Sequence, residues 1–140
     1  MYRRILVAVE HSPADETIIE HVTMLSGLTG ANLVLVHVAD GFAARHFDDL
    51  KLRESEEMKE DRAYLDQLAA RLSTPSRTVS TMLRMGDPAT EIIRAAEEAQ
   101  ADLIAMSTHG HRFINDLLRG TTVNRVRHEV RVPVLLLRAH

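Results

Sequence analysis

Five short apolar runs, separated by segments with helix signals, constrain the fold of this 140-residue chain more than any other feature. Each run is too short for a long helix and is rich in Val, Ile and Leu, as buried strands are. The runs cover residues 4–9, 31–38, 77–85, 101–107 and 132–138. Strands that alternate with helices predict a doubly wound α/β sheet, because parallel strands need crossover connections.

The first intervening segment has clear start and stop signals for a helix. Ser12 is followed by Pro13, a residue favoured at the first helical position, and Asp15 places a carboxylate where the helix dipole favours it. Gly27 and Gly30 mark the end. We therefore expect a helix that Ser12 caps.

Similar signals mark the later helices. Asp87 before Pro88 predicts a cap and a first helical residue, and residues 50–72 and 123–130 have helical spacing of their apolar positions. The last run contains Pro133, which lacks a backbone donor. That strand is therefore expected at an edge of the sheet, or to begin near the proline.

Composition excludes several classes of function. The chain has 17 basic and 20 acidic residues, a formal charge of −3, so it has no general attraction for nucleic acid or an anionic membrane. It has no cysteine, which excludes disulfides and thiolate chemistry. The apolar stretch near the amino terminus is too short for a signal peptide or a membrane span. We expect one cytoplasmic domain over residues 1–140.

The loop that leaves the fourth strand carries the strongest functional signal. Gly110 is followed, after nine residues, by Gly120, Thr121 and Thr122. Glycine lets a backbone approach a ligand closely, the threonines could cap a helix that begins there, and free amides at a helix start attract anions. The same glycines would also suit ordinary turns. Their position after a strand favours a phosphate site, because open α/β sheets bind ligands there.

Several motifs together resemble the universal stress protein family, in its UspA-like, adenine-nucleotide-binding branch. They are ILVAVEHS, LVLVHV, GDPATEII, ADLIAMSTHG, the Gly120-Thr121-Thr122 corner and VPVLLLR. The resemblance spans the chain and implies an open sheet of five parallel strands in the order 3-2-1-4-5, with helices on both faces. Family members that bind ATP have Gly-x2-Gly-x9-Gly-[Ser/Thr]. Here Ser107 replaces the first glycine.

The resemblance also implies roles for particular residues. Glu10 would lie near the nucleotide or its metal, the backbone of Val38 would contact adenine, and Gly86 and Pro88 would line the adenine side. The ribose and phosphates would be lined by Ser107, Gly110, Gly120, Thr121 and Thr122. Glu10 is one methylene longer than the usual aspartate, and Ser107 adds a Cβ, although its hydroxyl could donate to a phosphate.

Histidines do not suggest a metal site. His109 and His111 stand in the same loop without a third ligand close in sequence, so we interpret them as phosphate-side donors or exposed residues. His37, inside the second strand, is interpreted as a packed, hydrogen-bonded residue.

Two functions remain open. One is a regulatory protein that binds ATP or ADP, with Mg²⁺; the other is a dimeric interaction protein whose pocket is spoiled by Glu10 and Ser107. The two lysines, Lys51 and Lys59, lie outside the loop, so we expect no enzyme activity beyond slow hydrolysis. We also expect a homodimer through the carboxyl-terminal strand, whose apolar edge would otherwise be exposed.

Overall fold

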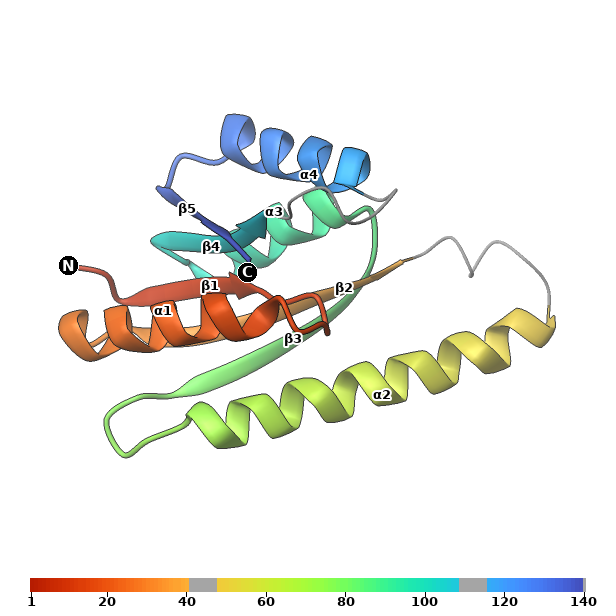
Figure 1. The fold of residues 1–140 in the computed structure, drawn as a ribbon, viewed down its shortest axis with the longest axis horizontal. Helices are drawn as coiled ribbons and strands as arrows, with labels where there is room; N and C mark the ends of the chain where they lie inside the picture. Colours follow the sequence, from red (N-terminus) through yellow and green to blue (C-terminus); the bar gives the residue numbers. More distant parts are fainter. Residues whose placement is uncertain (41–47, 109–115, 140) are drawn as a thin grey trace.

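The computed structural model describes the backbone of residues 1–40, 48–108 and 116–139, and the side chains of residues 1–39, 56–108 and 121–139. Along the chain lie β1 (Arg4–Ala8), α1 (Asp15–Thr29), β2 (Asn32–Asp40), α2 (Asp48–Leu72), β3 (Val79–Gly86), α3 (Pro88–Ala99), β4 (Leu103–Thr108), α4 (Asp116–Glu129) and β5 (Val134–Arg138) (Figure 1). The strands form one parallel sheet in the order β3-β2-β1-β4-β5. The predicted fold class and strand order are confirmed.

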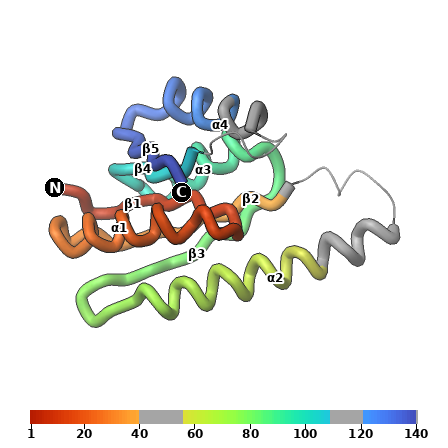
Figure 2. The backbone as a smooth tube through the Cα atoms, in the orientation of Figure 1, coloured from red at the N-terminus to blue at the C-terminus, as the bar shows by residue number. Residues whose placement is uncertain are grey.

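Helices cover both faces of the sheet. α1 and α2 pack on one face, and α3 and α4 pack on the other (Figure 2). Side chains of the central strand β1 alternate between the two layers: Ile5 and Val7 join the α1/α2 side, whereas Leu6 and Ala8 join the α3/α4 side. Ile5, Leu6 and Val7 have no exposed surface. This double coverage explains why β1 is a continuous apolar run.

The two edge strands are β3 and β5. β5 begins immediately after Pro133, whose carbonyl accepts a hydrogen bond from the Ile104 amide at 3.1 Å. A proline at the start of an edge strand removes no donor that the neighbouring strand needs. The predicted edge position of the last strand is thus confirmed.

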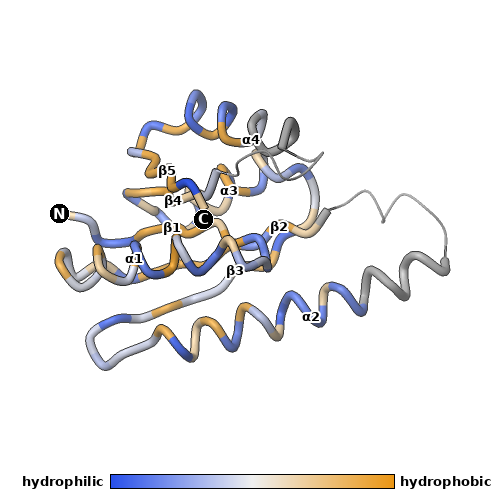
Figure 3. The backbone as a smooth tube through the Cα atoms, in the orientation of Figure 1, coloured by the Kyte–Doolittle hydropathy of each residue, from blue (hydrophilic) through white to orange (hydrophobic). Residues whose placement is uncertain are grey.

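α2 shows how a charged helix can still belong to the core. Leu65, Leu68 and Leu72 are buried at helical spacing, and hydrophobic and hydrophilic residues alternate along the helix (Figure 3). No helix in the described residues is both long and apolar enough to cross a membrane.

The start of α1 differs from the prediction. The helix begins at Asp15, and the residue in the capping position is Ala14, which has no side-chain cap. Ser12 Oγ instead accepts a hydrogen bond from the Ala14 amide at 3.3 Å, so it stabilises the turn that leads into the helix. Gly27 lies inside the helix, and Gly30, with φ 78°, ends it.

The start of α4 also differs from the prediction. α4 begins at Asp116, so Gly120, Thr121 and Thr122 lie within the helix and do not cap it. The amides that a helix leaves unpaired belong to its first four residues. The amides that the helix itself does not pair therefore lie nearer to Asp116 than to the two threonines.

Candidate functional site

The sheet has a single reversal of strand order in the described chain, between β1 and β4. From β1 the chain proceeds outward through β2 and β3, and then returns to place β4 on the other side of β1. Ligands of open parallel sheets bind beyond the carboxyl ends of the strands at such a reversal. Glu10 follows the end of β1, and Ser107 lies near the end of β4, opposite Leu137 of β5. The topology therefore brings these two predicted site residues to one edge.

Three further predicted residues reach this edge on the other side of β1. Val38 lies near the end of β2, opposite Arg84 of β3, and Asp40 lies opposite Gly86. Gly86 has φ 132°, a conformation that other residues adopt only with strain, and it leads directly into α3, whose first residue is Pro88. Val38, Gly86 and Pro88 thus line the β2/β3 part of the same edge.

The predicted phosphate side lies only partly within the described residues. His109 and Gly110 lie outside the described residues, as do His111 and Arg112. Gly120 is described by its backbone, within α4, whereas Thr121 is exposed and Thr122 is partly buried on the same helix. Val126, one turn further on, is fully buried in the layer that α4 shares with α3. α4 therefore holds the two threonines on the α3 side of the sheet.

Ser107 is the most unusual polar residue at this edge. The residue is only 7% exposed, and within the described chain it is the buried residue whose hydroxyl oxygen has no hydrogen-bond partner. By strand alternation it faces the layer of α1 and α2, as Leu103 and Ala105 do. A buried hydroxyl without a hydrogen-bond partner costs about 1–3 kcal/mol of folding free energy, so its presence at this edge needs an explanation.

A buried carboxylate organises the loop after β1, and sequence reasoning missed it. Asp15 has no exposed surface, and its oxygens accept hydrogen bonds from the amides of Glu10 at 2.8 Å and His11 at 2.9 Å, with a longer contact of 3.4 Å to the Ser12 amide. His11 adopts φ 61° within this loop. The fourth donor is the Tyr64 hydroxyl of α2, at 2.6 Å. Asp15 therefore fixes the backbone that carries Glu10.

The phenol of Tyr64 is a secure donor to Asp15. Burial raises the pKa of Tyr64, and the hydrogen bond to the Asp15 carboxylate raises that pKa further. The tyrosine keeps its proton at physiological pH. Asp15 had been interpreted as a carboxylate favoured by the helix dipole, and nothing near it in sequence indicates its partner on α2.

Two histidines meet one carboxylate beside this loop. Asp61 of α2 places Oδ1 2.7 Å from His11 Nδ1 and Oδ2 3.3 Å from His37 Nε2. The other ring nitrogen of His37, Nδ1, lies 2.9 Å from the carbonyl oxygen of Val9. The His11 ring also stacks on Tyr64, with ring centroids 4.1 Å apart. His37 is hydrogen-bonded, as predicted, through Nδ1 to the loop residue Val9, and Asp61 of α2 lies close to its other ring nitrogen.

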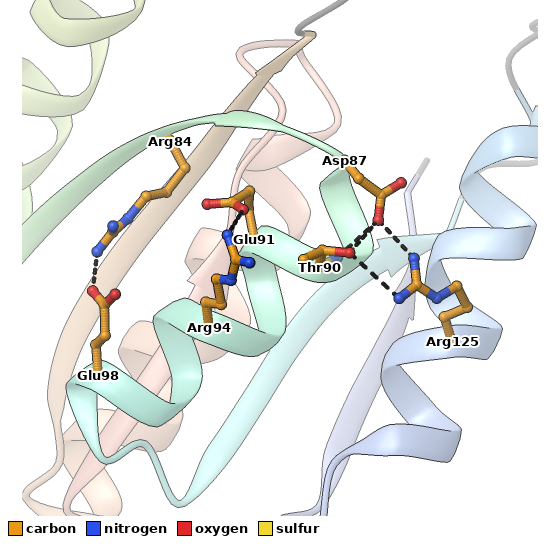
Figure 4. A network of polar contacts seen from close by, with 7 residues as sticks. All are labelled: Arg84, Asp87, Thr90, Glu91, Arg94, Glu98 and Arg125. Carbon is orange, nitrogen blue, oxygen red and sulfur yellow. Dashed lines mark hydrogen bonds and ion pairs between the residues drawn. The ribbon is translucent and has the colours of Figure 1, made fainter.

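Charged residues also surround the start of α3 (Figure 4). Asp87 caps the helix as predicted, since its side chain accepts from the Thr90 amide at 3.0 Å and from the Thr90 hydroxyl at 2.6 Å. Arg125 of α4 donates to the same carboxylate at 2.6 Å. The hydrogen bonds from Thr90, with a smaller contribution from Arg125, lower the pKa of Asp87. Arg125 is therefore engaged with a carboxylate beside the predicted adenine side of the edge.

The described part of the chain contains no group of three or more His, Asp or Glu side chains that could hold a metal ion. Mg²⁺ is commonly bound through phosphate oxygens as well as protein carboxylates. Glu10, partly buried after β1, is the predicted carboxylate for that role. Its Oε2 lies 3.5 Å from the Ser12 hydroxyl.

The sequence profile of the universal stress protein family matches residues 1–138. Universal stress protein MJ0577 of Methanocaldococcus jannaschii is 24% identical, over 99% of this chain and 96% of its own length. A solved structure of MJ0577 overlays with a TM-score of 0.83 and 23% identity, and the overlay covers 100% of this chain and 98% of that one.

Two other similar structures contain adenine nucleotides. One is a universal stress protein in complex with cAMP, with a TM-score of 0.70 and 17% identity over 98% of this chain and 97% of that chain. The other is the universal stress protein from Archaeoglobus fulgidus in complex with dAMP, with a TM-score of 0.69 and 21% identity over 96% and 97% of the two chains. At these identities the likeness shows a shared fold.

Proposed function

The chain belongs to the universal stress protein family, and we propose that it binds an adenine nucleotide, ATP or ADP, at the carboxyl edge between β1 and β4. In this proposal the bound nucleotide regulates how the protein interacts with a partner in the stress response. The site would draw on Glu10 after β1, Val38 and Gly86 beside it, and Ser107 with the loop that follows β4.

The orphaned hydroxyl of Ser107 carries the proposal. Ser107 is 93% buried, and its hydroxyl has no hydrogen-bond partner in the protein alone, which costs free energy of folding. If a ligand oxygen reaches this hydroxyl, the hydroxyl gains a hydrogen bond. The position is the one at which the nucleotide-binding pattern of the family has its first glycine. A ribose or phosphate oxygen at the end of β4 would accept this bond.

Two observations support an adenine nucleotide as the ligand. Related proteins of the same fold are in complex with cAMP and dAMP, which share the adenine ring. On this chain, Gly86 with φ 132° brings backbone without a side chain to the β2/β3 part of the edge, where a flat ring needs close approach. Glu10 also suits a nucleotide that is bound with Mg²⁺, because Mg²⁺ prefers oxygen ligands and Glu10 would supply a carboxylate oxygen beside the phosphates.

We propose a binding protein with slow or no hydrolysis. Enzymes that transfer phosphoryl groups commonly aim a lysine at the phosphates. The two lysines of this chain belong to α2, and Lys59 is exposed on that helix. Neither belongs to β4, to α4 or to the loop between them.

Calorimetric titration of the purified protein with Mg-ATP, Mg-ADP and Mg-GTP tests the proposal. We expect heat of binding and a thermal shift with the adenine nucleotides. Mg-GTP should bind more weakly, because the proposal places an adenine ring, and not a guanine ring, against the backbone at Gly86. Denaturing the purified protein should also release any nucleotide that it retained from the cell. No heat and no thermal shift at millimolar ligand would overturn the proposal, and would favour a dimeric interaction protein with a spoiled pocket.

A further inference from the structure

Asp15 places its carboxylate in a turn of backbone amides directly after β1. Its Oδ1 accepts a hydrogen bond from the Glu10 amide at 2.8 Å, and its Oδ2 accepts one from the His11 amide at 2.9 Å. Successive backbone N–H groups that converge on one point form an anion-binding concavity, and here the anion is a side chain of the protein itself. The conformation of the loop that carries Glu10 therefore depends on where the Asp15 carboxylate is held.

The Asp15 carboxylate also has a donor from outside the loop. Asp15 has no exposed surface, so its charge must be stabilised by hydrogen bonds from the protein. The Tyr64 hydroxyl donates to Oδ2 at 2.6 Å. A hydrogen bond to an ionised group is stronger than one between neutral groups. Tyr64 therefore helps to hold Asp15 against the loop amides.

Tyr64 connects two parts of the sheet. It belongs to α2, which packs on β2 and β3, whereas the loop that Asp15 holds leads from β1 into α1. One turn earlier on α2, Asp61 lies 2.7 Å from His11 Nδ1, but these two side chains are 14% and 37% exposed. Tyr64 is thus the α2 side chain that bonds to a fully buried partner in this loop and helix start.

The hydroxyl of Tyr64 can be separated from its ring. The ring stacks on His11, with centroids 4.1 Å apart, and packs against the α1/α2-side core. Tyr64→Phe keeps the ring, and so keeps both contacts, but it removes the group that donates to Asp15. This substitution therefore tests the hydrogen bond between α2 and the loop without removing the packing.

The chain of contacts ends at the proposed nucleotide site, because Glu10 is the carboxylate that follows β1 and Asp15 holds its amide. We propose that Tyr64 is a positioning residue for the nucleotide: its hydroxyl holds Asp15, Asp15 holds the loop, and the loop places Glu10 for the ligand. A loop that is already held in its binding conformation costs less free energy when the ligand binds. This inference rests on the proposed function, but the positioning itself can be observed without ligand.

The same contact acts in the other direction. Coupling between two sites is reciprocal, so a nucleotide that fixes the loop also stabilises the docking of α2 on the sheet. In the proposed regulatory function, α2 is therefore an element whose stability depends on the bound nucleotide.

Amide hydrogen exchange of the ligand-free protein tests the positioning. Tyr64→Phe should speed the exchange of the Glu10 and His11 amides several-fold. Ser26→Ala is the matched control, because it also removes one hydroxyl donor, to the Ala31 carbonyl at 2.6 Å, but at the opposite end of α1. It should leave the loop amides unchanged once the loss of stability, measured by urea unfolding, is taken into account. Equal exchange of the loop amides in the two variants on that basis overturns the inference.

Affinity for Mg-ADP is then measured by calorimetry. We expect Tyr64→Phe to bind several-fold more weakly than the wild type, and Ser26→Ala to bind as the wild type does. Unchanged affinity in Tyr64→Phe overturns the inference, because a purely structural hydrogen bond would lower stability alone.

The effect on α2 is read from its own amides. Mg-ADP should slow the exchange of the Leu65 and Leu68 amides more in the wild type than in Tyr64→Phe, and equal slowing overturns the reciprocal coupling. No binding of Mg-ADP by the wild type overturns the proposed function and the role of Tyr64 in it. Exchange of the loop amides without ligand still decides whether Tyr64 holds the loop.

Discussion

Arg125 of α4 donates a hydrogen bond of 2.6 Å to Oδ2 of Asp87, the carboxylate that caps α3. The contact joins the helix that follows the proposed phosphate side to the corner that contains Gly86 and Pro88. Because both side chains are substantially exposed, 40% and 56%, the ion pair itself should contribute little to stability. The cap should contribute more, because it satisfies the Thr90 amide.

The first prediction separates the cap from its charge. Asp87→Ala should destabilise the protein by about 1 kcal/mol, whereas Asp87→Asn, which keeps a capping oxygen, should cost less. The pKa of Asp87 is lowered in the folded state, so the contribution of its charge is present above the unfolded pKa near 4 and disappears as pH falls below it. Urea unfolding from pH 3 to pH 7 should show the difference between wild type and Asp87→Asn shrink below pH 4. A difference that grows in acid would contradict this account.

The second prediction is that one substitution at Ser107 raises the stability of the ligand-free protein and lowers its affinity for the nucleotide. Ser107→Ala removes a buried donor without a partner, so the ligand-free protein should become more stable by about 1 kcal/mol. The same change should weaken adenine nucleotide binding several-fold, because the ligand loses a donor. Ser26→Ala is the matched control: that buried hydroxyl donates to the Ala31 carbonyl at 2.6 Å, so its removal should destabilise the protein. If Ser107→Ala and Ser26→Ala destabilise the protein equally, the interpretation that the Ser107 hydroxyl lacks a partner is wrong.

The third prediction concerns alkaline pH. The folded state raises the pKa of Tyr64 above its unfolded value of about 10, so the resulting stability is complete below pH 10 and is lost as pH rises above it. Tyr64→Phe should cost about 1 kcal/mol at pH 8 through the lost bond to Asp15.

The difference between wild type and Tyr64→Phe should then narrow above pH 10 in urea unfolding. Tyr2→Phe serves as the control, because Tyr2 is the other tyrosine of the chain and packs against the α1/α2-side core. A constant difference up to pH 11 for Tyr64→Phe would show that the phenol does not act through its proton.

Local signals in the sequence predict most of the fold. Ile5, Leu6 and Val7 form a continuous apolar run because β1 is covered on both faces, and Asp87 before Pro88 is a cap that depends on neighbours in sequence. The predicted start of α4 was wrong because Gly120 was interpreted as the boundary of the helix. Glycine inside a helix costs only about 1 kcal/mol, which tertiary packing offsets.

The candidate site could be predicted only where it depends on strand ends. Glu10, Val38 and Ser107 reach one edge because parallel strands end together. The support of the loop could not be predicted, because Tyr64 and Asp15 are 49 positions apart in sequence and meet only when α2 packs beside α1. The hydrogen bond of His37 was predicted, but its proximity to Asp61 was not, since Asp61 lies on a helix that carries many charges.

The last prediction concerns a homodimer through β5, which we propose because this edge strand carries the partly buried residues 134–137. The Pro133 carbonyl and the Ala139 amide both bond to β4, so by alternation the backbone of Leu136 points away from β4 toward the free edge. Leu136→Pro should therefore remove a donor for a partner strand without removing a bond to β4.

Leu136→Ala is the matched control for that dimer, because it loses a similar amount of packing but keeps the backbone donor. Sedimentation at micromolar concentration should show a dimer for the wild type and for Leu136→Ala, and a monomer for Leu136→Pro, with circular dichroism confirming that each variant is folded. Pairing through β5 removes the edge from both subunits, and twofold symmetry makes the contact self-complementary. A monomeric wild type, or a dimer that persists in folded Leu136→Pro, would exclude backbone pairing through this strand.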